Sequence, residues 1–353
     1  MIVVNAKSIR LLVFLVALAL PCAAGVSCES ASTHPSSSDA DTDTDTDTDT
    51  DTDTDSDTDS DTDSDTDTGN STEGCQAVDL LFIIDDSNTM ESEQQMLIDS
   101  FQDFITVLEE YETVAGTQLD YRLGVTTTGI SVHYYVDGVP GAISLEGKDG
   151  ELIVPDGSTD PWIDGPGSNV ESDFTDLAQV GIYGPAYEMP LFAMQKTIEK
   201  SGSGGPNDGF LREDALFVAI FITDEDDCSR TDDYWTLPDV THSCFEYPTE
   251  HNLTDLTTFK SMLDTRFGGE EKYAIVVIAG QAPPDGSAPC DYGDDGAVSA
   301  GRLESFLDDH VNASGQHGLM HDMCEAQLQG NMVTALENAM TLIEVACDDF
   351  IIE

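Results

Sequence analysis

The sequence predicts an α/β domain with a doubly wound, mostly parallel sheet and helices on both faces. Three short apolar runs, 78–84, 216–222 and 273–279, have the composition of strands buried on both faces of a parallel sheet. Segments with apolar residues at helical spacing lie between these runs. Strands that alternate with helices in this way are typical of parallel sheets, because the intervening helix carries the chain back across the sheet.

The other elements are expected around these three strands. Residues 91–111 carry apolar side chains at helical spacing, and 121–127 is predicted to be the next strand. Residues 130–175 are rich in Gly, Pro and Asp and are interpreted as an insertion or an edge hairpin. The remaining expected elements are a helix from Glu188, helices over 256–267 and 302–311, and a final helix over about 325–346.

The first 27 residues have the pattern of a signal peptide. Lys7 and Arg10 precede an apolar stretch, 11–20, that is too short to span a bilayer, and small residues follow it. Two cleavage routes stay open: ordinary cleavage near Ala24, or cleavage before a lipid-modified Cys28. Cys28 follows a small residue, as in a bacterial lipobox, although the usual upstream Leu is missing. We therefore expect an exported protein, either secreted or held at the cell surface as an outer-membrane lipoprotein.

Residues 28–73 are predicted to form a disordered acidic tether. From Asp41 to Thr68, Asp alternates strictly with Thr or Ser, so fourteen of 28 residues are acidic and none is apolar. Mutual repulsion should stretch this segment into a spacer, although weak Ca²⁺ binding is an alternative function. The net charge of −58 falls only to −44 when these fourteen carboxylates are set aside. Such a chain favours cations and basic proteins as partners over nucleic acid, and we expect it to meet a membrane only through a lipid anchor.

The remaining residues, 74–353, are long enough for one large domain, and its first strand ends in oxygen donors. Asp85, Ser87 and Thr89 follow this strand at alternate positions, where an α/β sheet binds its ligands. One carboxylate and two hydroxyls are hard donors that suit Mg²⁺, Mn²⁺ or Ca²⁺. The alternative is a turn in which Ser87 or Asn88 caps the following helix.

The pattern Asp-x-Ser-x-Thr resembles the start of the metal-ion-dependent adhesion site of von Willebrand factor type A (VWA) domains, which reads Asp-x-Ser-x-Ser. Thr89 departs from that pattern but keeps the hydroxyl. The resemblance covers the whole region after Gly74, with insertions after Asp227 and Gly280. It is closest to a bacterial secreted subgroup whose Asn-x-Gly-Phe-Leu-Arg and Thr-Asp-Glu-Asp-Asp-Cys-Ser elements are found here at 207–212 and 223–229.

The resemblance implies a set of metal ligands. Asp85, Ser87 and Thr89 are expected to act with Asp224, which follows the strand 216–222. Glu188 falls in the loop position where the family supplies a Thr, so it would add a third carboxylate and weaken the pull of the ion on an acidic partner group. In the alternative interpretation, Glu188 is a first-turn helix carboxylate with Pro190 close behind.

Six cysteines follow residue 28, and an even number in an exported protein predicts disulfides, with fifteen possible pairings. Cys75 and Cys347 flank the first strand and last helix, which end near each other in VWA domains. Cys228 and Cys244 bracket an insertion that contains a proline, which leaves Cys290 with Cys324. The competing interpretation is a zinc site formed by His317, His321 and Cys324 on one helix face.

The function that the resemblance implies is a surface-exposed binding or adhesion module. It would engage a protein on the cell envelope or outside the cell through a divalent cation, with Mg²⁺ the first choice and Mn²⁺ or Ca²⁺ the alternatives. A structural envelope protein, in which the ion only stabilises loops, is the second hypothesis. Metal-assisted hydrolysis is the third, and we do not expect an enzyme, because the sequence has no Ser/His/Asp spacing, phosphate loop or HExxH motif.

Overall fold

The computed structural model describes residues 72–352 except 136–141, 186, 231–233, 237–251, 282–289, 291–295 and 312–315. These residues belong to one compact unit of the chain, which begins at Asp67. The predicted signal peptide, the lipidation candidate Cys28, nearly all of the predicted tether and Cys244 lie outside the described residues.

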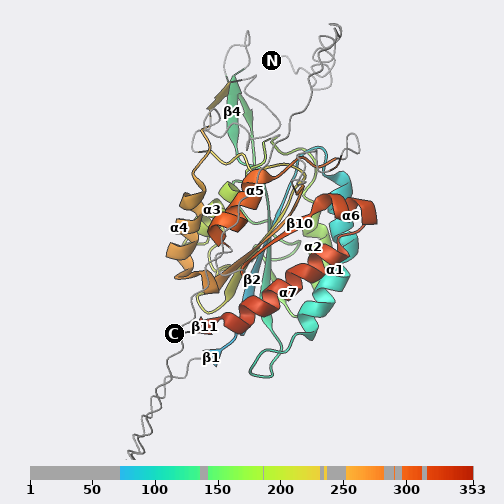
Figure 1. Ribbon diagram of the computed structural model, residues 1–353, viewed down its shortest axis with the longest axis vertical. Helices are drawn as coiled ribbons and strands as arrows, with labels where there is room; N and C mark the ends of the chain where they lie inside the picture. Colours follow the sequence, from blue (N-terminus) through green and yellow to red (C-terminus); the bar gives the residue numbers. More distant parts are fainter. Residues whose placement is uncertain are drawn as a thin grey trace, which may run out of the picture. The chain divides into compact units, whose positions relative to one another are not determined.

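The main sheet has six strands in the order β10-β9-β7-β2-β3-β6, and Figure 1 shows β2 near its centre. Every neighbouring pair is parallel except β3 with β6. The bounds are β2 (Ala77–Ile84), β3 (Asp120–Thr127), β6 (Ile163–Gly165), β7 (Leu216–Ile222), β9 (Tyr273–Ala279) and β10 (Gly318–Asp322). The predicted doubly wound, mostly parallel sheet is therefore confirmed.

Helices cover both faces of this sheet. Alternate residues of β2 show the division: Phe82 faces one apolar core and Ile83 faces the other, as expected from the period of two along a strand. The first core is covered by α1 (Glu91–Glu110), α2 (Val170–Ala178), α6 (Met323–Gln329) and α7 (Val333–Asp349). The second is covered by α3 (Pro190–Lys200), α4 (Leu256–Phe267) and α5 (Gly301–Phe306), the last continued by a π-helical turn (Leu307–Val311).

Smaller elements complete the described part of the domain. A three-stranded sheet joins β4 (Val132–Tyr135) to β5 (Ala142–Leu145) and β8 (Tyr234–Thr236). The short strands β1 (Thr72–Glu73) and β11 (Ile351–Ile352) pair near the two ends of the described chain, and a 3-10 turn, η2 (Glu270–Lys272), precedes β9. The segment interpreted as an insertion or edge hairpin thus contains the β4–β5 hairpin, the edge strand β6 and helix α2.

Two predicted elements differ from the structure at the C-terminal end of the chain. The single helix expected over 325–346 is two helices, because Gly330 adopts a left-handed conformation (φ 70°) that ends α6. Strand β10 was not predicted at all. Its sequence, Gly-Leu-Met-His-Asp, has no continuous apolar run, because the strand lies at an edge of the sheet.

The ends of the domain are joined covalently. Cys75 forms a disulfide with Cys347 of α7, the pairing that the family resemblance implies. Backbone hydrogen bonds support this junction, since the Cys75 N–H donates to the Cys347 carbonyl (2.9 Å) and the Gly74 N–H donates to the Phe350 carbonyl (2.9 Å). A second disulfide joins Cys290 to Cys324.

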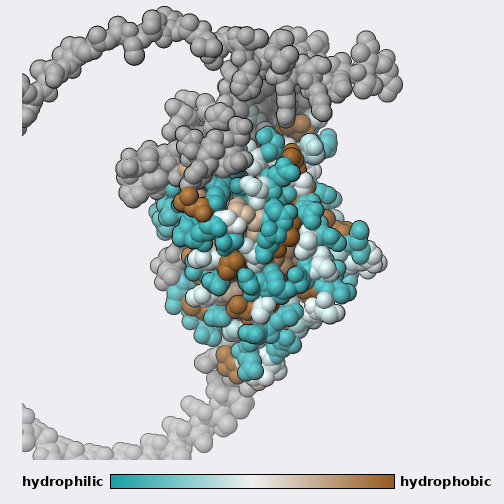
Figure 2. Space-filling model, turned by 90° about the vertical axis from the view of Figure 1, so that its right-hand side faces the viewer, coloured by the Kyte–Doolittle hydropathy of each residue, from teal (hydrophilic) through white to brown (hydrophobic). Residues whose placement is uncertain are grey.

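The surface of the domain is mainly polar on the side of α1 and α6. Figure 2 shows this face covered mostly by hydrophilic side chains, with hydrophobic residues scattered singly. None of the helices in the described ranges is both long and apolar enough to cross a membrane.

Replacing Cys75 and Cys347 together by Ala should lower the free energy of unfolding by about 5 kcal/mol, since the disulfide closes a loop of 272 residues. Urea unfolding of the oxidised wild type and the double variant measures this difference. A loss near zero would show that the bond does not constrain the unfolded chain as expected.

Candidate metal centre

The candidate centre begins where two neighbouring strands end. Ile84 of β2 lies opposite Ile222 of β7, and the Asp85 N–H donates to the Ile222 carbonyl (3.0 Å) one residue beyond the paired segment. Asp85 and Asp224 therefore emerge at the same edge of the sheet. This edge is the carboxyl end of the parallel strands, where α/β sheets bind ligands.

The residues that follow β2 form one polar cluster with those that follow β7. The Asp85 carboxylate accepts a hydrogen bond from the Ser87 N–H (2.7 Å) and another from the Thr223 hydroxyl (2.6 Å). The Ser87 and Thr89 hydroxyl oxygens lie 3.2 Å apart, and the Thr89 side chain lies close enough to Asp224 to lower the pKa of its carboxyl group. The structure thus brings together Asp85, Ser87, Thr89 and Asp224.

The alternative in which Ser87 or Asn88 caps the following helix is wrong. Helix α1 begins at Glu91, its N-cap residue is Met90, and no side chain caps it. The Ser87 backbone N–H instead closes a turn against Asp85, which directs the chain away from the strand end.

Glu188 lies beside the same cluster and is fully buried. Its backbone is held on both sides, by a bridge to Gly129 and by the Cys228 N–H, which donates to the Glu188 carbonyl (2.7 Å). One oxygen of its carboxyl group, Oε2, accepts a hydrogen bond from the Thr128 hydroxyl, whereas Oε1 is buried without a partner. Helix α3 begins only at Pro190, so the expected helix start at Glu188 and its first-turn interpretation are both wrong.

Burial makes ionisation of these carboxyl groups costly. It raises the pKa of Asp85 to about 6 and that of Asp224 to about 7, and the pKa of Glu188 rises well above its ordinary value. Mutual repulsion adds to the effect of burial, because Asp85 raises the pKa of both Asp224 and Glu188. The Asp224 Oδ1 atom, like Glu188 Oε1, is buried without a hydrogen bond.

Two further carboxylates belong to this cluster, and neither is among the predicted ligands. Burial raises the pKa of Glu225 to about 8, with Asp85 and Asp224 contributing. Burial also raises the pKa of Asp86 to about 6, although hydrogen bonds to Thr127 and its own backbone and the charge of Lys148 oppose this. Each residue adjoins a predicted ligand, but a run of consecutive acidic residues does not show which side chains turn inward.

A glycine makes room for Asp86. The Gly184 N–H donates to the Asp86 carbonyl (2.8 Å), and a Cβ atom on Gly184 would lie 2.2 Å from Asp86 Oδ1. The Gly184–Pro185 segment before α3 therefore packs directly against the residue that follows Asp85.

The last two acidic residues of the 223–229 element are structural. Asp226 accepts hydrogen bonds from the backbone N–H groups of Arg302 and Leu303 at the start of α5. Asp227 accepts one from the Leu191 N–H at the start of α3 (3.1 Å) and forms a buried ion pair with Arg302 (2.8 Å). These contacts hold α3 and α5, two of the three helices that cover the second core, at the strand ends.

The zinc interpretation is wrong, because Cys324 is bonded to Cys290. His321 lies in strand β10, and the ring of His317 is within hydrogen-bonding distance of the Tyr273 carbonyl (3.1 Å), so the three residues do not share a helix face. Cys228 is also in a disulfide, and its predicted partner Cys244 lies outside the described residues.

The donors at the strand ends fit a hard divalent cation. Across the described ranges, no three carboxylate, imidazole or thiol side chains form a metal site by themselves. A complete coordination sphere here would also need the Ser87 and Thr89 hydroxyls and water, all of which are oxygen ligands. Three carboxylate oxygens of this cluster, on Asp86, Glu188 and Asp224, are buried without a hydrogen-bond partner, and those of Glu188 and Asp224 belong to predicted ligands.

Comparisons with known proteins give only distant similarity. No model of a protein family matches the chain, and no curated protein matches it. Among solved structures, proximal thread matrix protein 1 from the mussel byssus, one structure of which has a zinc-occupied MIDAS motif, matches with 14% identity and a TM-score of 0.39. The match covers 78% of this chain and 49% of that protein, so this chain spans about half its length.

Two other solved structures are similar at the same level. Manganese-loaded TRAP from Plasmodium vivax matches with 15% identity, a TM-score of 0.35, and coverage of 78% of this chain and 76% of that one. The pilus adhesin SpaC from Lactobacillus rhamnosus GG matches with 13% identity, a TM-score of 0.38, and coverage of 77% and 31%. Overlap this weak assigns no function to the present chain.

The raised pKa values predict how the stability of the protein depends on pH when chelator has removed all metal. In the unfolded chain these carboxyl groups titrate near their ordinary pKa of about 4, whereas in the fold Asp85, Asp224 and Glu225 hold their protons to about 6, 7 and 8. The stabilisation is therefore complete below pH 4 and is lost as the pH rises through 6 to 8. Thermal unfolding at pH 5 to 8 in chelator should show a falling midpoint, and a rising midpoint would contradict the ionisation states assigned here.

Proposed function

We propose that Asp85, Ser87, Thr89, Asp224 and Glu188 hold one divalent cation, either Mg²⁺, Mn²⁺ or Ca²⁺, and that the domain binds a protein partner through this site. The observation that carries the proposal is the burial of Asp85, Glu188 and Asp224 together, the last two with an oxygen that has no hydrogen-bond partner. Two like charges about 5 Å apart repel by about 3 kcal/mol at an effective dielectric constant of 20. A bound cation would remove this repulsion and allow the carboxylates to ionise at neutral pH.

The site has one side that reaches solvent. Thr89 and Glu225 are partly exposed and Asn88 is exposed, whereas Asp85 and Glu188 are fully buried. The buried carboxylates would bind the ion on the side that faces the protein interior. When bound, the ion would supply positive charge that attracts a carboxylate of the partner from the solvent side.

Glu188 supports the second candidate, an envelope protein in which the ion only stabilises loops. Three carboxylates carry more negative charge than a divalent ion neutralises, which weakens its attraction for a further anion. The buried position of Glu188 between Gly129 and Cys228 also suits a residue that ties loops together. The two candidates share the metal site and differ in whether a partner binds to it.

The proposed setting is outside the cell. Disulfides persist in oxidising compartments, and Cys75–Cys347 and Cys290–Cys324 fit that environment. We propose that the acidic tether holds the binding domain away from the cell surface, with Cys28 as the candidate lipid anchor, and that the protein is not an enzyme.

Asp85→Asn should abolish Mg²⁺ binding, because it replaces the one carboxylate that contacts residues from both strand ends. The matched control is Asp103→Asn, which removes one exposed carboxylate from α1. Isothermal titration of the chelator-treated chain with Mg²⁺ and Mn²⁺ measures the affinity. Equal affinity in wild type and Asp85→Asn, with both folded by circular dichroism, would refute the site.

Glu188→Thr separates the two candidate functions. If Glu188 is a ligand, the change should weaken metal binding and, in an adhesion module, strengthen capture of an acidic peptide by the metal-loaded protein. Glu188→Gln is the control for volume, since it keeps the shape of the side chain and removes only its charge. If metal affinity is unchanged in both variants, Glu188 is not a ligand. If metal binding is weaker but the protein captures no peptide, the structural candidate is favoured.

A further inference from the structure

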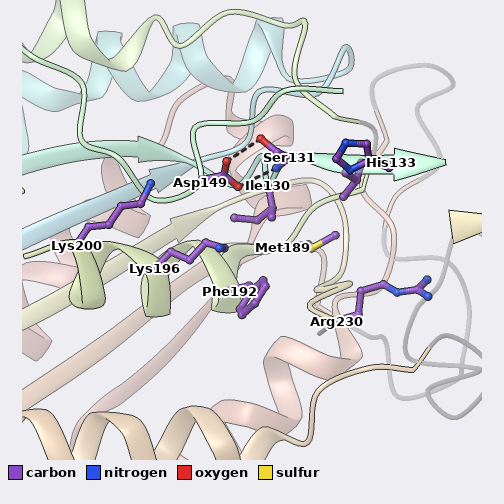
Figure 3. A pocket seen from close by; sticks show the side chains of 10 residues that line it. Ile130, Ser131, His133, Asp149, Met189, Phe192, Lys196, Lys200 and Arg230 are labelled. Carbon is purple, nitrogen blue, oxygen red and sulfur yellow. Dashed lines mark hydrogen bonds between the residues drawn. The ribbon is translucent and has the colours of Figure 1, made fainter. Parts of the chain in front are cut away.

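A cavity of about 550 Å³ lies beside the candidate metal centre and is lined by basic side chains. Lys196 and Lys200 of α3 line one side, and Arg230 lies at the other end of the view in Figure 3. The chain has 70 acidic residues and only twelve Lys and Arg, so a cluster of three cationic residues around one cavity is unexpected from its composition. Apolar side chains, among them Ile130 and Met189, line the same cavity.

The spacing of the residues on α3 explains this arrangement. Phe192, Lys196 and Lys200 are four residues apart, so they lie along one face of the helix. The Lys196 ammonium nitrogen lies 5.0 Å from the centre of the Phe192 ring, and Figure 3 shows this side chain extending toward Ile130 and Met189. The charge of Lys196 is thereby held beside apolar side chains of the cavity.

The acidic side chains near the cavity leave the charge of Lys196 unneutralised. The Asp149 carboxylate accepts hydrogen bonds from the Ser131 N–H (2.9 Å) and the Ser131 hydroxyl (2.7 Å). Glu151 forms an ion pair with Lys200 (3.1 Å), whereas Lys196 contacts the Phe192 ring and has no ion pair with any residue that the structure describes. At physiological ionic strength charges are screened beyond about 8 Å, so these local groups, and not the net charge of the protein, decide which ligand enters.

We infer that this cavity binds an acidic peptide segment in which a carboxylate adjoins an apolar side chain. The lysines provide charge for the carboxylate, and Phe192, Met189 and Ile130 provide contact area for the apolar group. None of the residues that line the cavity is a proposed metal ligand, so this binding does not depend on the ion. The cavity nevertheless adjoins the proposed site. Its lining residue Met189 follows Glu188 in the chain, and its lining residue Ile130 follows Gly129, the bridge partner of Glu188.

The test is isothermal titration of the chain with the blocked peptide acetyl-Glu-Phe-Glu-amide. The neutral peptide acetyl-Gln-Phe-Gln-amide and the peptide without an apolar group, acetyl-Glu-Gly-Glu-amide, should each bind at least about tenfold more weakly. Inorganic phosphate should compete poorly, because it has no apolar group. A peptide of alternating Asp and Thr should also bind weakly, and binding as tight as that of Glu-Phe-Glu would overturn the inference and point to the tether as the occupant.

Substitutions on α3 locate the binding. Lys196→Gln should weaken binding of Glu-Phe-Glu by about tenfold, and Lys196→Gln with Lys200→Gln should abolish it. Glu151→Gln should strengthen binding, because it releases Lys200 from its ion pair. Lys260→Gln is the matched control, since it removes one Lys from α4 that is paired with Asp264, and it should have no effect.

The same titrations in chelator, and with Asp85→Asn, separate this inference from the proposed metal site. Binding of Glu-Phe-Glu should persist in both, whatever the result for Mg²⁺. Failure of the peptide to bind wild type, or equal binding to wild type and the double lysine variant, would overturn the inference even if the metal site is correct.

Discussion

The parallel pairing of β2 with β3 and β7 is the constraint on which the rest of the structure depends. All eight residues of β2 and all seven of β7 are buried, so the two strands must lie inside the sheet with helices on both faces. Their register places Ile84 beside Ile222, which brings Asp85 and Asp224 to one edge. The strands that form the core therefore also bring these two carboxylates together, and this is the origin of their mutual repulsion.

The polar residues at this edge divide into two groups with different roles. Asp226 and Asp227 accept hydrogen bonds from helix N–H groups and from the buried guanidinium of Arg302, although burial and the neighbouring Asp227 still raise the pKa of Asp226 to about 7. Asp85, Glu188 and Asp224 are buried near one another beside the partly exposed Glu225, and neighbouring carboxylates raise the pKa values of Glu188, Asp224 and Glu225. Removing either partner of the Asp227–Arg302 pair would leave the other charge buried and uncompensated, which is strongly destabilising. The cavity that Met189 helps to line differs from both acidic groups, because its charged side chains from α3 are the basic Lys196 and Lys200.

The sequence predicted the core of this arrangement better than its edges. Strands β7 and β9 have the predicted bounds, because a continuous apolar run of this short length is typical of a buried strand. Strand β10 and the break at Gly330 were missed, since an edge strand needs no apolar run and a glycine is tolerated within a helical pattern. For the site, Asp85, Ser87, Thr89 and Asp224 follow two neighbouring strands, and their role as metal ligands stays a prediction. The contact of Glu188 with Thr128 depends on chain segments 60 residues apart. The inward turn of Asp86 and Glu225 likewise depends on the loops around them.

A crystal structure of the chain grown with Mn²⁺, with anomalous diffraction recorded at the manganese edge, tests the central claim most directly. The account predicts one strong anomalous peak at the carboxyl ends of β2 and β7, about 2.2 Å from oxygens of Asp85 or Asp224 and of Ser87 or Thr89. Such a peak would also show whether Glu188 reaches the ion. Diffraction that shows no peak at this edge, with Glu188 Oε1 and Asp224 Oδ1 still buried and without a partner, would contradict the assignment of a metal site.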